Sequence, residues 1–118
     1  MPDLDEELFL RAVAFLELQR ENYRRYGTLL GLQQEAAAGS DFARVLELAD
    51  EVDGILGELA RLAPVCERLA EEDRGHLAGP RAEAIERLIE ALTEDTMAVE
   101  QQVRTLTKAL TPGAAPAA

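Results

Sequence analysis

The sequence predicts an all-α protein: an elongated antiparallel helical hairpin plus a third helix, forming a coiled-coil-like three-helix bundle. Aromatic residues make up 4% of the 118 residues and Trp is absent, whereas the abundant Ala, Leu, Glu and Arg favour helices over strands. Apolar residues recur every three or four positions over three long stretches, and short glycine-containing segments separate these stretches. A chain of this length forms one domain, and we expect it to span residues 1–110.

The first helix is expected over residues 4–37, a stretch without proline. At a rise of ~1.5 Å per residue it would be about 50 Å long, which favours an elongated bundle over a compact globule. Gln19 and Asn22 fall at inward positions between two apolar blocks, where buried amides need partners and loosen the packing. The apolar stripe consists of Leu8, Ala12, Phe15, Leu16, Tyr23, Tyr26, Leu29 and Leu30.

The second helix is expected over residues 41–72 and runs antiparallel to the first because the connection is short. Gly39 suits a left-handed C-cap, and Ser40 or Asp41 can accept hydrogen bonds from the free amides of the next helix. A heptad seam contains Val45, Leu48, Val52, Ile55, Leu59, Leu62, Cys66 and Leu69. A second stripe widens this face enough to touch two neighbouring helices, and it consists of Phe42, Ala49, Leu56, Ala63 and Ala70.

Pro64 interrupts the second helix. Proline removes one backbone hydrogen bond and costs ~3 kcal/mol inside an ideal helix. The apolar seam nevertheless stays in phase between Leu62 and Cys66, so we expect a kinked, continuous helix. A separate helix that begins at Pro64 is the alternative.

Residues 73–79 are expected to form a loop, because Gly75 and Gly79 punctuate them. A third helix follows over residues 80–110, with Pro80 in its first turn. Residues 111–118 contain nothing large to bury and are expected to be a disordered tail. The apolar face of the third helix consists of Ile85, Leu88, Leu92, Val99, Val103, Leu106 and Leu110.

The charge balance excludes several classes of partner. A formal net charge of -11, from 23 acidic and 12 basic residues, repels the phosphates of nucleic acids and of anionic membrane surfaces. No apolar run is long enough to span a bilayer, so we expect no membrane insertion. The acidic start of the chain lacks the features of a secretory signal, which predicts a cytoplasmic protein. The single cysteine, Cys66, has apolar neighbours and is expected to pack as a small hydrophobic residue.

The sequence contains no recognisable catalytic constellation, so we expect no enzyme activity, no cofactor and no metal site. His76 is the only histidine; with Asp73 it would supply two ligands on a loop, and di-metal bundles need more. The acidic clusters 5–7 and 71–73 are interpreted as solvated charge at a helix start and before a loop. Phosphate-binding loops, Cys-x-x-Cys pairs and nucleophile elbows are absent from the sequence.

The third helix has two interpretations. Its face of Leu, Ile and Val is typical of helices that dock into a groove of a partner. Alternatively, the same face completes the core of the three-helix bundle. The periodicity is compatible with both.

Three features together resemble FlgN-type flagellar export chaperones: the Leu- and Gln-containing first helix ending in Leu32-Gln33-Gln34-Glu35, the corner at 37–42, and the Leu/Glu-rich run over 45–62. The resemblance covers residues 5–110. It implies an acidic cytoplasmic chaperone that binds the C-terminal amphipathic helices of hook-filament junction proteins and presents them for flagellar type III secretion. It also implies a partner-binding region in the third helix, at Val99, Val103, Leu106 and Leu110.

A structural role is the alternative to a chaperone. The wide apolar face of the second helix would then be covered by a second copy of the chain, in a coiled-coil homo-oligomer that serves as a scaffold or adaptor module.

Overall fold

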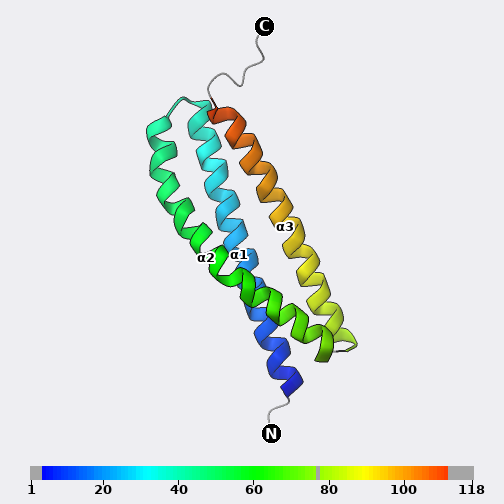
Figure 1. Ribbon diagram of the computed structural model, residues 1–118. Coiled ribbons are helices and arrows are strands. Elements are labelled where there is room, and N and C mark those ends of the chain that lie inside the picture. The colour runs from blue at the N-terminus through cyan, green and yellow to red at the C-terminus, as the bar shows by residue number, and fades with distance from the viewer. Residues whose placement is uncertain (1–3, 77, 112–118) are drawn as a thin grey trace.

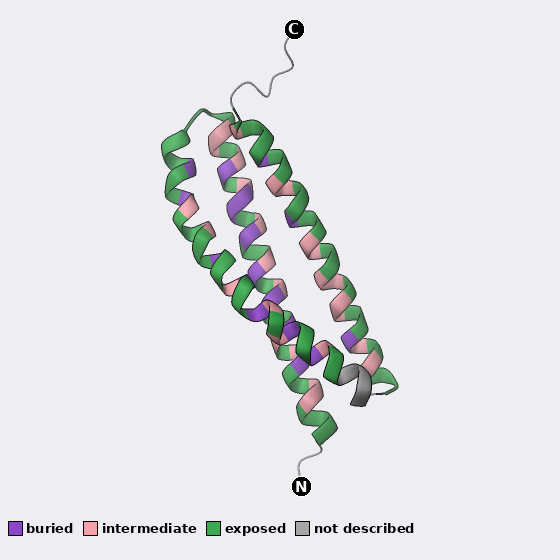
Figure 2. Cartoon of the chain, in the orientation of Figure 1, coloured by how far each residue is buried: buried purple, intermediate pink, exposed green. Residues whose placement is uncertain are grey.

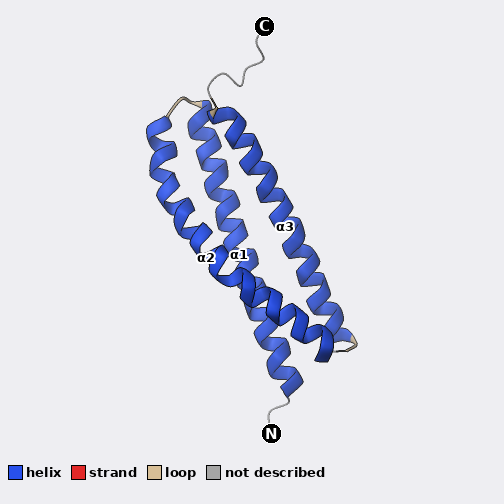
Figure 3. Cartoon of the chain, viewed as in Figure 1, coloured by secondary structure: helices blue, strands red, loops and turns tan. Residues whose placement is uncertain are grey.

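The computed structural model describes residues 4–76 and 78–111, with the side chains of residues 73–76 excepted, and within these ranges it contains three helices and no strand (Figures 1 and 3). They are α1 (Leu4–Ala38), α2 (Phe42–His76) and α3 (Pro80–Leu110). The predicted all-α three-helix bundle is confirmed. Most of the expected tail, residues 112–118, lies outside the described residues.

The corner between α1 and α2 closes the hairpin with a Schellman-type arrangement. The Ser40 amide donates to the Ala37 carbonyl at 3.0 Å, and the Asp41 amide donates to the Ala36 carbonyl at 2.8 Å. The left-handed residue is Ser40, with φ of 58°, so the prediction that Gly39 takes this conformation is wrong. Asp41 caps α2, because its Oδ1 accepts a hydrogen bond from the Arg44 amide at 3.1 Å.

The helix α2 continues to His76, and the prediction of a loop from residue 73 is therefore wrong over 73–76. A single glycine, Gly75, costs a helix only ~1 kcal/mol and does not end it. The chain turns instead at Gly79, whose φ of 65° is readily adopted only without a side chain, and Pro80 starts α3. The side chain of His76 lies outside the described part.

Pro64 lies inside a continuous α2, as the sequence predicts. Figure 1 shows that α2 bends part-way along its length, where it crosses α1. Because Pro64 has no amide hydrogen, the Ala60 carbonyl in the preceding turn of α2 lacks its usual helical donor. The Gln19 amide of α1 donates to the Leu59 carbonyl in this turn at 2.9 Å, so α1 and α2 are joined by a buried hydrogen bond next to the bend.

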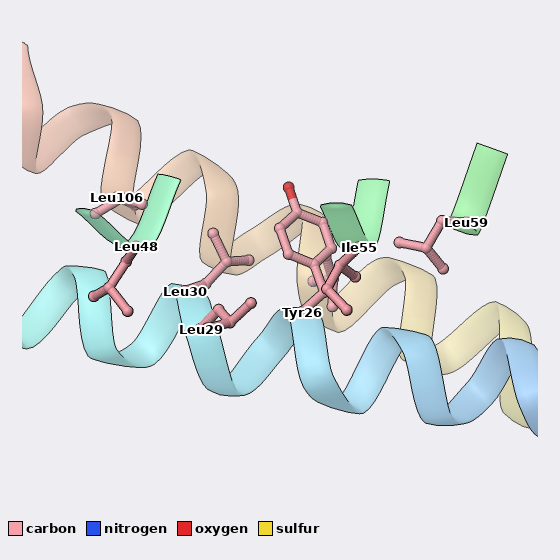
Figure 4. Close-up of a cluster of buried hydrophobic side chains, with 8 residues drawn as sticks. Tyr26, Leu29, Leu30, Leu48, Ile55, Leu59 and Leu106 are labelled. Atoms are coloured by element: carbon pink, nitrogen blue, oxygen red, sulfur yellow. The ribbon is translucent and has the colours of Figure 1, made fainter. Parts of the chain in front are cut away.

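The helix α1 is the centre of the bundle, because both other helices pack on it (Figure 2). Two apolar clusters follow its length. One surrounds Tyr26, Leu30 and Leu48 (Figure 4), and the other surrounds Leu16 and Ile85. All the predicted seam residues of α2 are buried except Val52, which is partly buried against the first cluster.

Polar residues separate the two clusters, as the sequence predicts. Gln19 and Asn22 are each 3% exposed. The Asn22 amide donates to the Gln19 Oε1 over 3.5 Å, which is long for a hydrogen bond. The bundle therefore contains a polar layer near its middle, and this layer belongs to α1.

Polar contacts also join α1 to α3. Arg20 forms an ion pair with Asp95, with a distance of 2.8 Å between Nε and Oδ2. The Gln102 amide donates to the Gly27 carbonyl at 3.1 Å. A Cβ atom at Gly27 would stand 3.1 Å from the Gln102 Oε1, so the absence of a side chain allows this close approach.

The helices α2 and α3 make few contacts with each other. Figure 1 shows α1 between them over much of the bundle, with their closest approach near the turn that joins them. The molecule is elongated, with principal dimensions of 66 × 28 × 18 Å. On the side of the bundle where α2 and α3 face each other, the two helices are therefore not closely packed.

Candidate functional site

The feature that distinguishes this bundle is an apolar groove between α2 and α3, which we call the α2–α3 groove. Its base is formed mainly by α1, and it has two continuous halves that share Tyr23, Ala63 and Thr96. The half beside Ile89 encloses about 310 Å³, and the half beside Val103 encloses about 560 Å³. The base residues from α1 are Leu16, Gln19, Tyr23 and Tyr26.

The α2 side of the groove follows from the second apolar stripe of that helix. Residues 56, 63 and 70 recur at the heptad interval and lie beside the buried seam, so burying the seam against α1 turns this stripe toward the gap. Leu56 is 41% exposed although it is a large apolar residue. The rim on this side consists of Leu56, Ala60, Ala63, Glu67, Ala70 and Glu71.

The α3 side has larger side chains. Val99 belongs to the apolar cluster around Tyr26, and Ile89 packs against the cluster around Leu16. These contacts with the core orient α3 so that one of its faces lines the groove. Thr96 lies at the middle of this side, and its hydroxyl donates to the Leu92 carbonyl at 2.9 Å. The lining from α3 consists of Ile89, Leu92, Thr96, Val99, Glu100, Val103 and Arg104.

Two groups at the base of the groove have altered acidity. Burial raises the pKa of the Tyr26 hydroxyl above its ordinary value of 10.0, and neighbouring Tyr23 raises it further. Burial also raises the pKa of the Cys66 thiol, and Glu67 adds to the effect. Both groups are therefore neutral near pH 7, and the base of the groove presents uncharged side chains.

The four residues predicted to bind a partner occupy different positions. Val99 and Val103 line the groove, Val99 at its base with 6% exposure and Val103 partly buried at its side. Leu106 is 7% exposed and belongs to the core. Leu110 is partly buried against the same cluster and lies outside the groove lining. Only half of the set therefore lies on the groove.

The partner-binding residues predicted from the sequence all lie on α3, whereas the groove is also lined by residues of α1 and α2. For α2, the sequence predicts only that a second copy of the chain could cover its wide apolar face. The signal for these residues in the sequence is the second apolar stripe of α2, which predicts a face wide enough to touch two helices. The periodicity does not show that α3 packs mainly on α1 and makes few contacts with α2. This arrangement leaves Leu56, Ala60 and Ala63 on the open groove.

Comparison with protein-family models, with curated proteins and with solved structures found no match for this chain. Among the side chains that the structure describes, no group of three or more His, Cys, Asp or Glu is placed to hold a metal ion. Of the helices in the described ranges, none has the combination of length and apolar character that crossing a membrane requires.

Proposed function

We propose that this chain is a non-enzymatic chaperone that holds an amphipathic helix of another protein in the α2–α3 groove. The observation that supports the proposal best is the packing of α2 and α3 on α1 with an open apolar groove between them. A fourth helix in this position would complete a four-helix bundle, in which each helix buries one face against its neighbours.

The energetics suit a reversible complex. Each large apolar side chain that a client buries contributes ~1.5–3 kcal/mol. Association and side-chain ordering oppose binding by several kcal/mol in total. Three or four apolar anchors along the groove would therefore give useful affinity without trapping the client, as a chaperone requires.

The resemblance to FlgN-type chaperones supplies the biological context of the proposal. In that context the protein acts in the cytoplasm during biogenesis of the bacterial flagellum. Its clients are hook-filament junction proteins, which it binds through their C-terminal amphipathic helices before type III secretion. The groove would keep the apolar stripe of such a helix from aggregating.

The test fills the groove without removing any core residue. Ala63 lines both halves of the groove, so Ala63→Trp places a large side chain where the client helix is expected to lie. We expect binding of C-terminal client fragments, measured by isothermal titration calorimetry, to weaken by at least about tenfold. Circular dichroism is expected to be unchanged, since the added ring occupies open space.

Ala98→Trp is the matched control, because Ala98 is exposed on α3 and lies outside the groove lining. This variant is expected to bind clients like the parent protein. Unchanged client binding by Ala63→Trp would contradict the proposal. Leu106→Asp is unsuitable as a site probe, because it would bury an unpaired charge in the core and unfold the protein.

A homo-oligomeric scaffold remains the second candidate, and one observation favours it. Phe42 and Leu46 at the start of α2 are 52% and 72% exposed, on the helix that carries the groove stripe. A second copy could cover them. Light scattering separates the two functions: a monomer that gains the mass of one client fragment supports the chaperone, whereas a stable dimer insensitive to added fragments supports the scaffold.

A further inference from the structure

The charged side chains of the α2–α3 groove are mostly acidic. Among the described residues, four charged side chains line it: Glu67, Glu71, Glu100 and Arg104. Glu67 and Glu71 lie one turn apart on the α2 rim, and Glu100 lies on the α3 rim. Both rims of the groove therefore carry carboxylates, and only one of the four charges is positive.

Glu67, Glu71 and Glu100 form no ion pair with another described side chain. Such pairs between described side chains are found at Arg20–Asp95, Arg24–Glu21, Arg44–Glu47 and Arg61–Glu58. The guanidinium of Arg104 donates to the side chain of Gln101 at 3.0 Å rather than to a carboxylate. The rim therefore keeps its negative charge, in a protein whose formal net charge is already -11.

The dimensions of the groove fit a single helix. Its lining runs from Leu56 to Glu71 on α2 and from Ile89 to Arg104 on α3. At 1.5 Å per residue, each side is about 22 Å long, which corresponds to about four helical turns. The α2 side of the groove contains the small side chains of Ala60, Ala63 and Ala70, which leave space for large apolar side chains of a bound helix.

The base of the groove includes the hydroxyl of Tyr26. Tyr26 is 9% exposed and lines the groove, yet its hydroxyl forms no hydrogen bond with a described residue. Figure 4 shows this hydroxyl directed away from the axis of α1. A polar side chain within the stripe of a bound helix can satisfy it, whereas a purely aliphatic stripe leaves it unpaired.

We infer that the helix held in the α2–α3 groove is basic, with an apolar stripe of about four turns flanked on both sides by Lys or Arg that face Glu67, Glu71 and Glu100. This inference rests on the proposed function for the use of the groove and adds the chemistry of the client. Opposite charges on the rim select the partner and orient it, while the apolar stripe supplies most of the affinity. An acidic amphipathic helix of the same shape meets like charge at Glu67 and Glu71 on the α2 rim and at Glu100 on the α3 rim, where Arg104 offsets part of it.

Two synthetic helical peptides test the inference on the full-length protein. They share one length and one stripe of leucines with a central Gln, and they differ only in the flanking positions, which are Lys in one peptide and Glu in the other. Calorimetry at low ionic strength is expected to show at least about tenfold tighter binding of the Lys peptide, because three exposed charge pairs contribute modestly and add up. The ratio is expected to narrow at high salt, where exposed charges are screened.

A variant with reversed charge at the groove rim provides a second test of the inference. The triple variant Glu67→Lys, Glu71→Lys, Glu100→Lys is expected to invert the preference and bind the Glu peptide more tightly. The control variant reverses Glu51, Glu72 and Glu94, which are exposed on the same two helices, line neither half of the groove and make the same change in net charge. It is expected to keep the preference for the Lys peptide.

The outcomes separate this inference from the proposed function. Equal affinity for the two peptides, with binding still lost in Ala63→Trp, overturns the basic client and leaves helix binding in place. Inversion by the control variant also overturns it, because the preference then reflects net charge alone. Binding of neither peptide overturns both the inference and the use of the groove.

Discussion

Burial in the bundle changes the acidity of the Cys66 thiol. Its Sγ lies 3.6 Å from the Phe15 carbonyl oxygen, and the side chain is 5% exposed. Because burial disfavours the thiolate, the pKa of the thiol rises above its ordinary value of 9.0. The thiol is therefore a packing residue of the groove base rather than a reactive group.

The raised pKa predicts a pH dependence of stability with a defined sign. Below pH 9.0 the thiol is protonated in both the folded and the unfolded chain, and its contribution to the free energy of unfolding is fully present. As the pH rises further, the unfolded chain releases the proton first, so this contribution is lost. Denaturant unfolding of the parent and of Cys66→Ala at pH 7.5 and pH 10 measures the effect.

The parent is expected to lose more stability between these pH values than Cys66→Ala. The comparison removes the contribution of Tyr26, whose pKa is also raised, because both proteins contain this tyrosine. Equal losses in the two proteins would show that the thiol is not desolvated in the fold.

The buried amides of α1 are the other informative residues. Gln19 and Gln33 each donate to a backbone carbonyl of α2, those of Leu59 and Val45, at 2.9 and 3.1 Å. A buried amide that lost its partner would cost about 1–3 kcal/mol. These bonds therefore favour one register of α1 against α2 over slipped pairings that would leave them unmade.

At the scale of the helix, the glycines of α1 differ in what surrounds them. Gly31 has open space where a Cβ would stand, whereas a Cβ at Gly27 would lie 3.1 Å from the Gln102 Oε1. Gly31→Ala is therefore expected to stabilise the protein by about 0.5–1 kcal/mol through helix propensity alone. Chemical denaturation measures this gain.

Gly27→Ala is the comparison, and it is expected to gain less. The new methyl group displaces the Gln102 side chain, whose amide then loses its bond to the Gly27 carbonyl. An equal gain in the two variants would mean that Gln102 does not hold α3 against α1 in solution.

The helices also show how far the sequence determines the fold. The seam of α2 and the polar break at Gln19 and Asn22 were predictable, because burial on one face imposes a three-four spacing that survives in the sequence. Continuity through Pro64 was predictable for the same reason, since the seam keeps its phase. The local geometry of the turn was less predictable. Ser40 rather than Gly39 is left-handed, because this conformation lets the Ser40 and Asp41 amides donate to the Ala37 and Ala36 carbonyls, and these bonds outweigh the preference for glycine.

The candidate site was only partly predictable. The resemblance to FlgN-type chaperones implies a binding region in the third helix, and this location fits Val99 and Val103, which line the groove. It does not distinguish them from Leu106, which is buried in the core. Periodicity identifies apolar faces but does not say which helix covers which face. The groove exists because α3 packs on α1, and this packing joins residues distant in sequence, such as Leu16 and Ile85 in one apolar cluster and Arg20 and Asp95 in an ion pair.

At the scale of the whole molecule, a radius of gyration of 18.4 Å describes a rod. A compact domain of this length would measure about 13–14 Å. The rod has three long helices but only two extensive interfaces between them, α1 with α2 and α1 with α3. The missing interface is the basis of both proposals, because it leaves an apolar groove that is as long as a short client helix.

The most direct test measures the separation of α2 and α3 in solution. Spin labels at Gly57→Cys and Gln101→Cys, in a Cys66→Ala background, mark exposed positions of the two helices outside the groove lining. Double electron–electron resonance is expected to give the separation found in the structure, nearly unchanged when a client peptide is added. A much shorter separation in the free protein, typical of α2 packed against α3, would mean that the bundle is closed and would contradict the account.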